Sequence, residues 1–276
     1  MKFTLAAAVA SALAIAATTT SAGVVISQTA VATSPTSVRT TPQTVMIEGR
    51  KQKIADAHRE TITDLDAGVM YTLNPAMKNF VKTTIPPKGM MAAAMEHEGM
   101  GVGYQKAAAT DKAAGYACQD YTGTAMTMNT RLEVTQCAAS EAPGAREYVD
   151  FHKALADKLK GSPLEPKGEV PDGIPVKSKI AFIQVPLPLP RQFDPKVAAE
   201  YEANIAAANR NPPTTVTTVT KIEVKNLPAD TFTVPKEYKE QQLQPAMRTI
   251  PGLPRPVMPP RAPSKAAPAS GAPAPM

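Results

Sequence analysis

The chain has 276 residues, a formal net charge of +6, two cysteines, no tryptophan and only 5% aromatic residues. Five of its basic residues, namely Lys2, Arg248, Arg255, Arg261 and Lys265, lie near the two ends, so the rest of the chain carries only about +1. A nucleic-acid groove needs clustered Lys and Arg with stacking aromatic side chains, and this composition argues against nucleic acid as a partner.

The first residues have the pattern of an export signal. Lys2 supplies a positive start, residues 5–17 form an apolar run, and residues 20–22 are small. The apolar run is too short to cross a bilayer core of roughly 30 Å as a helix. No other segment approaches the roughly 18 apolar residues of a transmembrane helix. We therefore predict a signal peptide over residues 1–22 and a mature, non-transmembrane, soluble chain in the periplasm.

Short β-prone runs separated by Asp, Gly, Asn and Pro follow, which is typical of an antiparallel sheet. The last run, residues 214–225, is the strongest because every residue in it is β-branched or charged. The expected strands are residues 24–33, 44–48, 51–56, 60–64, 69–73, 80–83, 101–107, 115–124, 128–137, 177–184 and 214–225.

Helical patterns interrupt these strands at three places. Residues 90–97 favour a short helix, and a second starts at Pro143 and ends before Gly161. A third starts at Asp194 and ends at residues 211–213. In the second helix one face carries Tyr148, Val149, His152, Leu155 and Leu159.

The two cysteines favour a disulfide. Cys118 and Cys137 form an even pair in a chain expected to fold in an oxidising compartment. Structural zinc takes four ligands, so two cysteines alone make a poor metal site. A hairpin centred between Thr127 and Met128 places the cysteines directly opposite each other, at about 5 Å.

The C-terminal end differs in composition from the rest. Residues 244–276 contain ten prolines and no sustained apolar period, which predicts an extended, disordered tail. The remaining residues 23–243 then form one β-rich domain. A basic tail on a nearly neutral domain suits contact with an anionic cell-envelope surface.

Residues 90–100 (MMAAAMEHEGM) are the most suggestive local cluster for chemistry. Thioether and imidazole ligands suit Cu(I), which makes Met91, Met95, His97 and Met100 candidate copper ligands. The alternative is that the methionines line a core or an apolar cavity. The chain shows no His pair at metal-binding helical spacing and no G-x-S-x-G elbow. We therefore predict no enzymatic activity, no cofactor and, copper aside, no metal.

Three segments carry a family resemblance. Residues 62–75 (ITDLDAGVMYTLNP) are similar to the central hairpin of LolA/LolB-like periplasmic carriers. Residues 114–121 (AGYACQDY) and 227–238 (LPADTFTVPKEY) resemble the "aGYkC-x-x-Y" strand and closing "F-x-x-P-x-x-Y" segment of an exported family of unknown function assigned to that fold. The resemblance covers residues 24–239 in order.

This resemblance implies an α+β, mainly β fold: a curved antiparallel sheet, or half-barrel, with helices on its concave side. In the carriers the concavity shelters acyl chains, so a lipid or a lipidated protein is the expected ligand. The candidate lining residues are Val69, Tyr71, Leu73, Met91 and Met95, with the inward-facing side of the strand left open. The leading hypothesis is a non-enzymatic periplasmic binding protein; the alternatives are an envelope interaction protein that acts through its tail and a copper-handling protein.

Overall fold

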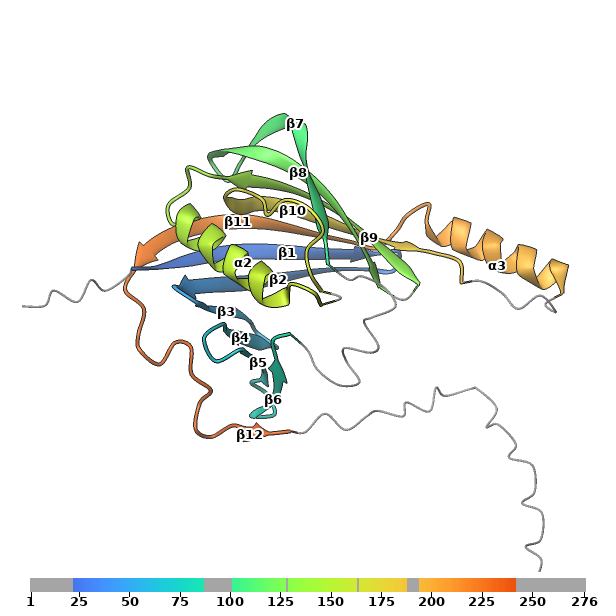
Figure 1. The fold of residues 1–276 in the computed structure, drawn as a ribbon. Coiled ribbons are helices and arrows are strands. Elements are labelled where there is room, and N and C mark those ends of the chain that lie inside the picture. The colour runs from blue at the N-terminus through green and yellow to red at the C-terminus, as the bar shows by residue number, and fades with distance from the viewer. Residues whose placement is uncertain (1–21, 87–100, 128, 163, 188–193, 242–276) are drawn as a thin grey trace, which may run out of the picture. The chain divides into compact units, whose positions relative to one another are not determined.

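The computed structural model describes residues 22–86, 101–127, 129–162, 164–187 and 194–241, which form a curved twelve-stranded sheet with two helices (Figure 1). The predicted signal peptide and tail lie outside these residues except for Ala22, and so does the helix expected at residues 90–97. The predicted class, mainly β with a curved antiparallel sheet, is confirmed.

The strands follow one another across the sheet almost in chain order. They are β1 (Gly23–Ser34), β2 (Ser37–Glu48), β3 (Lys51–Asp56), β4 (Glu60–Asp64), β5 (Val69–Asn74), β6 (Asn79–Thr84), β7 (Gly103–Ala113), β8 (Tyr116–Thr127), β9 (Thr130–Ala139), β10 (Ile174–Gln184), β11 (Thr214–Lys225) and β12 (Lys239–Glu240). Their order is β12-β6-β5-β4-β3-β2-β1-β11-β10-β9-β8-β7. Two antiparallel runs, β1 to β6 and β7 to β11, therefore meet where β1 pairs with β11.

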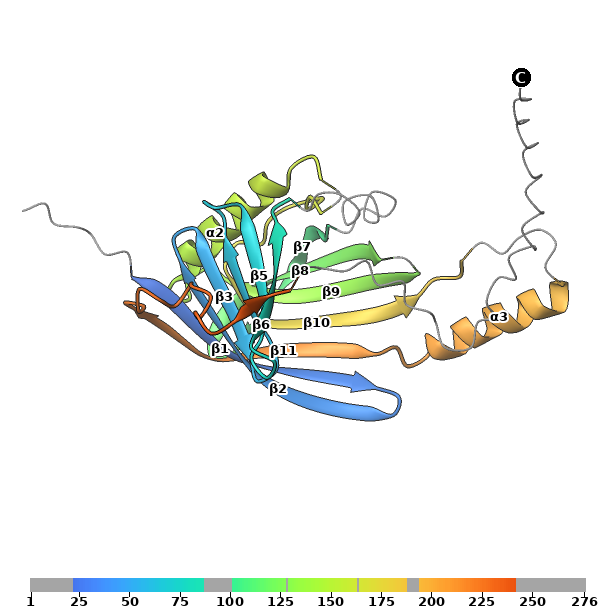
Figure 2. The same cartoon turned by 90° about the horizontal axis from the view of Figure 1, so that it is seen from below.

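Helix α2 (Ala145–Leu159) lies across the concave face of the sheet, where it contacts β1, β2 and β10 (Figures 1 and 2). Phe151 is fully buried, and it belongs to a core that includes Ile26, Ile47 and Val176. The backbone amide of Gly49 donates a hydrogen bond to the Glu147 carboxylate, which ties the first turn of α2 to the β2–β3 turn. The helix is thus fixed at one end by packing and by a polar contact.

Helix α3 (Pro195–Ala208) occupies the connection between β10 and β11 and extends beyond the end of the sheet (Figures 1 and 2). Asp194 caps it by accepting a hydrogen bond from the Lys196 amide at 2.8 Å, and Ile205 is its buried residue. The expectation of more than one helix on the concave side therefore holds for α2 only. A helix with one buried side chain has little apolar surface with which to hold a sheet.

The predicted disulfide between Cys118 and Cys137 is present, with the two Cα atoms 5.2 Å apart. The predicted hairpin register is wrong by two residues: Asp120, not Cys118, lies opposite Cys137, and Thr127 pairs with Thr130. The disulfide therefore joins diagonal neighbours on β8 and β9, and both cysteines are buried in the core.

The C-terminal part of the described chain returns to the far edge of the sheet. Three successive turns follow β11 between residues 228 and 238, and β12 then pairs in parallel with β6. The amide of Gln241 donates to the carbonyl of Phe80 at 2.7 Å. The later part of the chain thus pairs with both ends of the β1–β6 run: β11 pairs with β1, and β12 pairs with β6.

Candidate functional site

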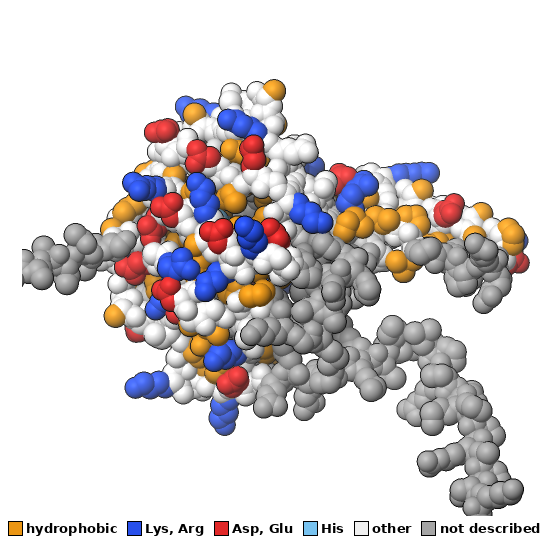
Figure 3. All heavy atoms as spheres, in the orientation of Figure 1, with side chains coloured by type: hydrophobic (Ala, Val, Ile, Leu, Met, Phe, Trp, Pro, Cys, Tyr) orange, Lys and Arg blue, Asp and Glu red, His pale blue; other side chains and the backbone are white. Residues whose placement is uncertain are grey.

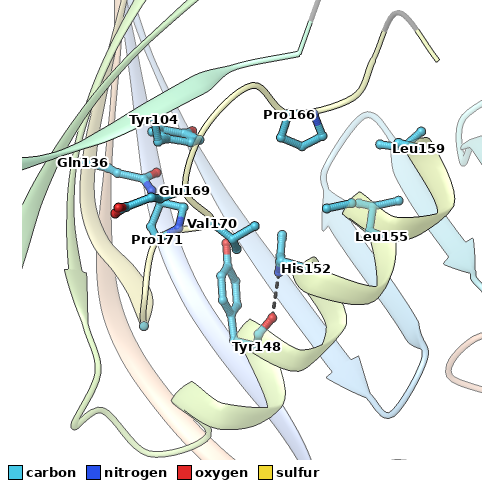
Figure 4. A pocket seen from close by; sticks show the side chains of 12 residues that line it. Tyr104, Gln136, Tyr148, His152, Leu155, Leu159, Pro166, Glu169, Val170 and Pro171 are labelled. Carbon is cyan, nitrogen blue, oxygen red and sulfur yellow. Dashed lines mark hydrogen bonds between the residues drawn. The ribbon is translucent and has the colours of Figure 1, made fainter. Parts of the chain in front are cut away.

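A cavity of about 230 Å³ lies between α2, the neighbouring strands and the segment that connects α2 to β10 (Figure 4). We call residues 164–173 of this connection the strap. Helix α2 contributes one face, the strap contributes Pro and Val side chains, and β7 and β9 close the far side. The lining residues are Tyr104, Gln136, Tyr148, His152, Leu155, Ala156, Leu159, Pro166, Glu169, Val170, Pro171 and Gly173.

Backbone contacts hold the strap against β7 and β8. The Glu169 amide donates to the Tyr104 carbonyl at 3.2 Å, and the Asp172 amide donates to the Tyr121 hydroxyl at 3.2 Å. A Cβ atom on Gly103 would overlap the Lys167 carbonyl, so this close approach requires glycine there. The prolines of the strap exclude a regular helix or central strand. The strap is therefore an irregular cover whose position is fixed by its neighbours.

Tyr148 and His152 stack against each other on the cavity face of α2. Their ring centroids are 4.0 Å apart with planes at 22°, and His152 Nδ1 lies 2.8 Å from the Tyr148 carbonyl oxygen. When Nδ1 donates its proton to this carbonyl, Nε2 is left as the acceptor. The stack thus presents flat apolar faces with polar edges.

The titratable groups of the stack are uncharged at neutral pH. Burial raises the pKa of Tyr148, and the nearby Tyr104 raises it further. Burial also raises the pKa of Tyr104 and lowers the pKa of His152. Among the described lining residues only Glu169 carries a charge, and it is exposed at the rim. The interior of the cavity is therefore apolar with neutral polar tips, as in many sites for apolar ligands.

We predict that acid destabilises the folded protein through His152. Its folded-state pKa lies below 6.5, whereas the unfolded chain keeps the ordinary value of about 6.5. Below that pH the unfolded state binds more protons, so the free energy of unfolding falls until the pH reaches the folded-state pKa. Between about pH 7.5 and about pH 5.5 this loss, measured by urea unfolding, should reach at most about 1.4 kcal/mol, the limit for a histidine that stays neutral in the folded state.

His152→Gln should remove that part of the loss, because it no longer titrates. His58→Gln, which changes an exposed histidine, should retain the full wild-type loss. An unchanged pH dependence in His152→Gln would contradict the assignment to this group.

A second cavity of about 190 Å³ lies deeper along the same face and shares Tyr148 and His152 with the first. Its floor includes Ile26 of β1, Val45 of β2 and Ile54 of β3. Because the stack lines both cavities, it forms the wall between them.

The strand residues predicted to line a cavity lie on the other face of the sheet. Directly paired residues of antiparallel strands share a face, and Val45 pairs with Ile54, Ile54 with Thr61, and Thr61 with Thr72. Thr72 therefore lies on the α2 face. Its alternating neighbours on β5 point away from α2: Val69, Tyr71 and Leu73.

On that opposite face Val69 and Leu73 are buried, while Tyr71 is half-buried and packs edge-on against Phe80 with centroids 5.9 Å apart. The structure does not bring these three residues to the α2 cavity. The predicted role of these three residues in binding remains a prediction, and it would concern the face of the sheet opposite the α2 cavity.

The methionine cluster lies outside the described residues, so the structure does not place Met91, Met95, His97 or Met100. Within the described residues no group of three or more His, Cys, Asp and Glu side chains is arranged to hold a metal ion. None of the helices in that same part of the chain is long and apolar enough to cross a membrane. On the face seen in Figure 3, Lys and Arg side chains alternate with Asp and Glu.

Sequence reasoning identified the helical face that lines the cavity but used it only to predict the helix. Tyr148, His152, Leu155 and Leu159 were expected on one face, and all four line the cavity. The strap was missed because its prolines carry no periodic signal. A His and a Tyr one turn apart on an otherwise apolar helical face were the signal in the sequence for a site.

The fold defines an open, curved antiparallel sheet with one helix in its concavity. No protein-family model matches the chain, and no curated protein matches it. Among solved structures, one of PNGF-II is similar at a TM-score of 0.38 and 10% identity, covering 80% of this chain and 31% of that one. The chain thus spans about a third of the length of PNGF-II.

Other structural neighbours are of about this chain's size. A LolA superfamily protein from Nitrosomonas europaea is similar at a TM-score of 0.28 and 6% identity, covering 77% of this chain and 90% of that one. A DUF1329 family protein from Desulfovibrio piger is similar at a TM-score of 0.33 and 10% identity, covering 78% and 90%. The neighbours thus include LolA superfamily and domain-of-unknown-function proteins, the kinds that the sequence motifs resemble.

Proposed function

We propose that this chain is a non-enzymatic periplasmic binding protein that holds an acyl chain, free or attached to a partner, between α2 and the strap. The observation that carries the proposal is the apolar cavity enclosed by Leu155, Leu159, Val170 and the Tyr148–His152 stack. The strap closes this apolar lining, and the amides of Glu169 and Asp172 tie it to Tyr104 and Tyr121 of the sheet.

The size of the cavity selects the kind of ligand. At about 230 Å³ it exceeds the ~150 Å³ of an engineered cavity that binds benzene. It falls short of the roughly 300 Å³ at which sites for drug-sized molecules begin. Such a space suits a segment of one acyl chain rather than a whole diacyl lipid. The second cavity, of about 190 Å³, adjoins the first at the stack, and its lining combines Ile26, Val45 and Ile54 with polar side chains such as Gln28 and Gln52.

Burial supplies the free energy of binding. Each methylene removed from water contributes about 0.8 kcal/mol, so six buried methylenes contribute about 5 kcal/mol before the cost of immobilising the ligand. Because the interior of the cavity is lined by neutral groups, an apolar chain that enters it removes no charged side chain from contact with water. The strap supplies an entrance, because its contacts with β7 and β8 can break without unfolding the sheet.

Native mass spectrometry with lipid extraction, on protein purified from the periplasm without detergent, tests the proposal. A discrete extra mass that matches a lipid or an acylated peptide is the expected result. A bare polypeptide mass, together with failure of added fatty acid to bind, would reject the carrier function. It would favour the alternative in which the tail makes the contacts.

Filling the cavity should reduce binding without disturbing the fold. Ala156 lines the cavity, whereas Lys153 is exposed on the same helix. Ala156→Phe should lower fatty-acid affinity by about tenfold, because the ring displaces at least two methylenes. Lys153→Phe, with the same added ring, should bind as wild type does. Isothermal titration with both variants measures the difference, and equal affinities would place the ligand elsewhere.

Location and tail function are also proposals. The N-terminal export pattern supports a periplasmic address, which fractionation of the tagged chain would test. Deleting residues 244–276 should have a mild effect on ligand binding if the α2 cavity is the site. Loss of localisation on that deletion would support the tail as an envelope contact instead.

A further inference from the structure

A polar hollow lies on the same concave face as the two cavities, toward the tip of the β1–β2 hairpin. It measures about 450 Å³ and is lined in part by the small side chains Ala30 and Ala32 of β1 and Thr215 of β11. Its titratable lining residues are Arg39 of β2, Asp56 at the end of β3, and His58 and Arg59 of the β3–β4 turn. The hollow thus sets two guanidinium groups beside small side chains that leave the sheet surface open.

Strand register makes the hollow continuous with the deeper cavity. Gln28 lines the deeper cavity and pairs with Gln43, which lines the hollow; their side-chain amides are 3.1 Å apart. The next pairs on this face are Ala30 with Thr41 and Ala32 with Arg39. Because alternate residues of a strand share a face, these pairs form one uninterrupted floor.

The arginines of the hollow are available to a ligand. Neither Arg39 nor Arg59 has an ion-pair partner among the described residues, and both are exposed. Asp56 is engaged by the turn, since its carboxylate accepts hydrogen bonds from the amides of His58 at 2.7 Å and Arg59 at 2.9 Å. Two exposed guanidinium groups that line one hollow and have no ion pair in the described part of the chain match an anionic oxygen cluster.

We propose that the ligand is an amphiphile with one acyl chain and an anionic head group, whose head binds Arg39 and Arg59 while its chain follows β1 toward Tyr148. This inference rests on the proposed function and names the ligand class. Carboxylate and phosphate heads share the required chemistry, an oxygen anion on the end of an acyl chain.

The length of the floor fits such a molecule. From Ile26 to Ala32 is six residues, or about 20 Å at the roughly 3.3 Å rise of a strand. One leaflet of a bilayer core is about 15 Å deep, and an acyl chain of ordinary length fills it. A head group at the arginines therefore brings the end of such a chain into the second cavity, which Gln28 and the Tyr148–His152 stack line.

The test compares three single-chain probes on the delipidated full chain, below their aggregation concentrations: palmitate, palmitoyl lysophosphatidic acid and monopalmitoylglycerol. The two anionic probes should bind at least about tenfold more tightly than the neutral one. Arg39→Gln/Arg59→Gln should abolish most of that preference and leave monopalmitoylglycerol unaffected. Arg131→Gln/Arg146→Gln removes two exposed arginines elsewhere and should keep the preference.

The two anionic probes also distinguish the head groups: tighter binding of palmitate would indicate a carboxylate, and tighter binding of lysophosphatidic acid would indicate a phosphate. Equal binding of all three probes, unchanged in the Arg39/Arg59 variant, would overturn the inference and leave the acyl-chain proposal standing. Failure of every probe to bind would reject both. Inorganic phosphate that binds the hollow as tightly as lysophosphatidic acid would show a free-anion site and would also overturn the inference.

Discussion

Phe151→Ala should lower the free energy of unfolding by about 3–5 kcal/mol. The Phe151 side chain is 0% exposed and is the largest fully buried side chain in the structure. It lies where α2 meets β1, β2 and β10, so its loss removes apolar burial and leaves a cavity that the stiff sheet cannot close. Urea unfolding followed by circular dichroism measures the change.

Two controls separate the cavity from a general effect of losing a phenylalanine. Phe151→Leu keeps most of the volume and should cost less than about 1.5 kcal/mol. Phe182→Ala changes a partly exposed side chain on β10 and should cost clearly less than Phe151→Ala. Equal losses at positions 151 and 182 would show that α2 is not the anchor of the core.

Removing the disulfide should have the second largest effect. Cys118 and Cys137 are separated by 19 positions in the chain, and closing a loop of that length stabilises the folded state by about 3 kcal/mol in the chain-entropy account. Cys118→Ala/Cys137→Ala should therefore lower the melting temperature by roughly 6–12 °C for a domain of this size. Differential scanning calorimetry measures the shift.

Reduction of the wild type by dithiothreitol provides an independent comparison. It should lower the melting temperature by a similar amount and should leave the double alanine variant unchanged. A reduced wild type that melts at the oxidised temperature would mean that β8 and β9 are held by their ladder alone.

The sequence was informative where local chemistry decides structure. Short β-prone runs bounded by turn residues predicted the bounds of β3 and β4 to the residue, and the run of β-branched and charged residues did the same for β11. The apolar spacing of α2 was an equally local signal, because it depends on residues that lie within one or two turns of each other. The disulfide joins residues 19 positions apart, and it could be predicted because the chain has only two cysteines.

The features that sequence reasoning missed either lack a local signal or are decided at long range. The β8–β9 register depends on which two residues make the turn, and residues 126–129 carry no strong turn signal. β12 has two residues and exists only because β6 offers an edge. Alternation shows that β5 has two faces but not which one meets α2, because that depends on a helix about 75 positions further along the chain.

The pairing of β1 with β11 has a consequence for how the molecule is made. Gly23 lies opposite Lys225, so the first strand to be synthesised waits for nearly the last one. At roughly 5–20 residues per second, translation of the intervening chain takes on the order of ten seconds or more. Throughout that interval the edge of β1 that later pairs with β11 stays unpaired, and the two runs of strands are not yet joined into one sheet. A secretion apparatus that accepts only unfolded polypeptide could therefore still translocate the nascent chain during this interval. The β1–β11 pairing would form only after all strands of the sheet are available.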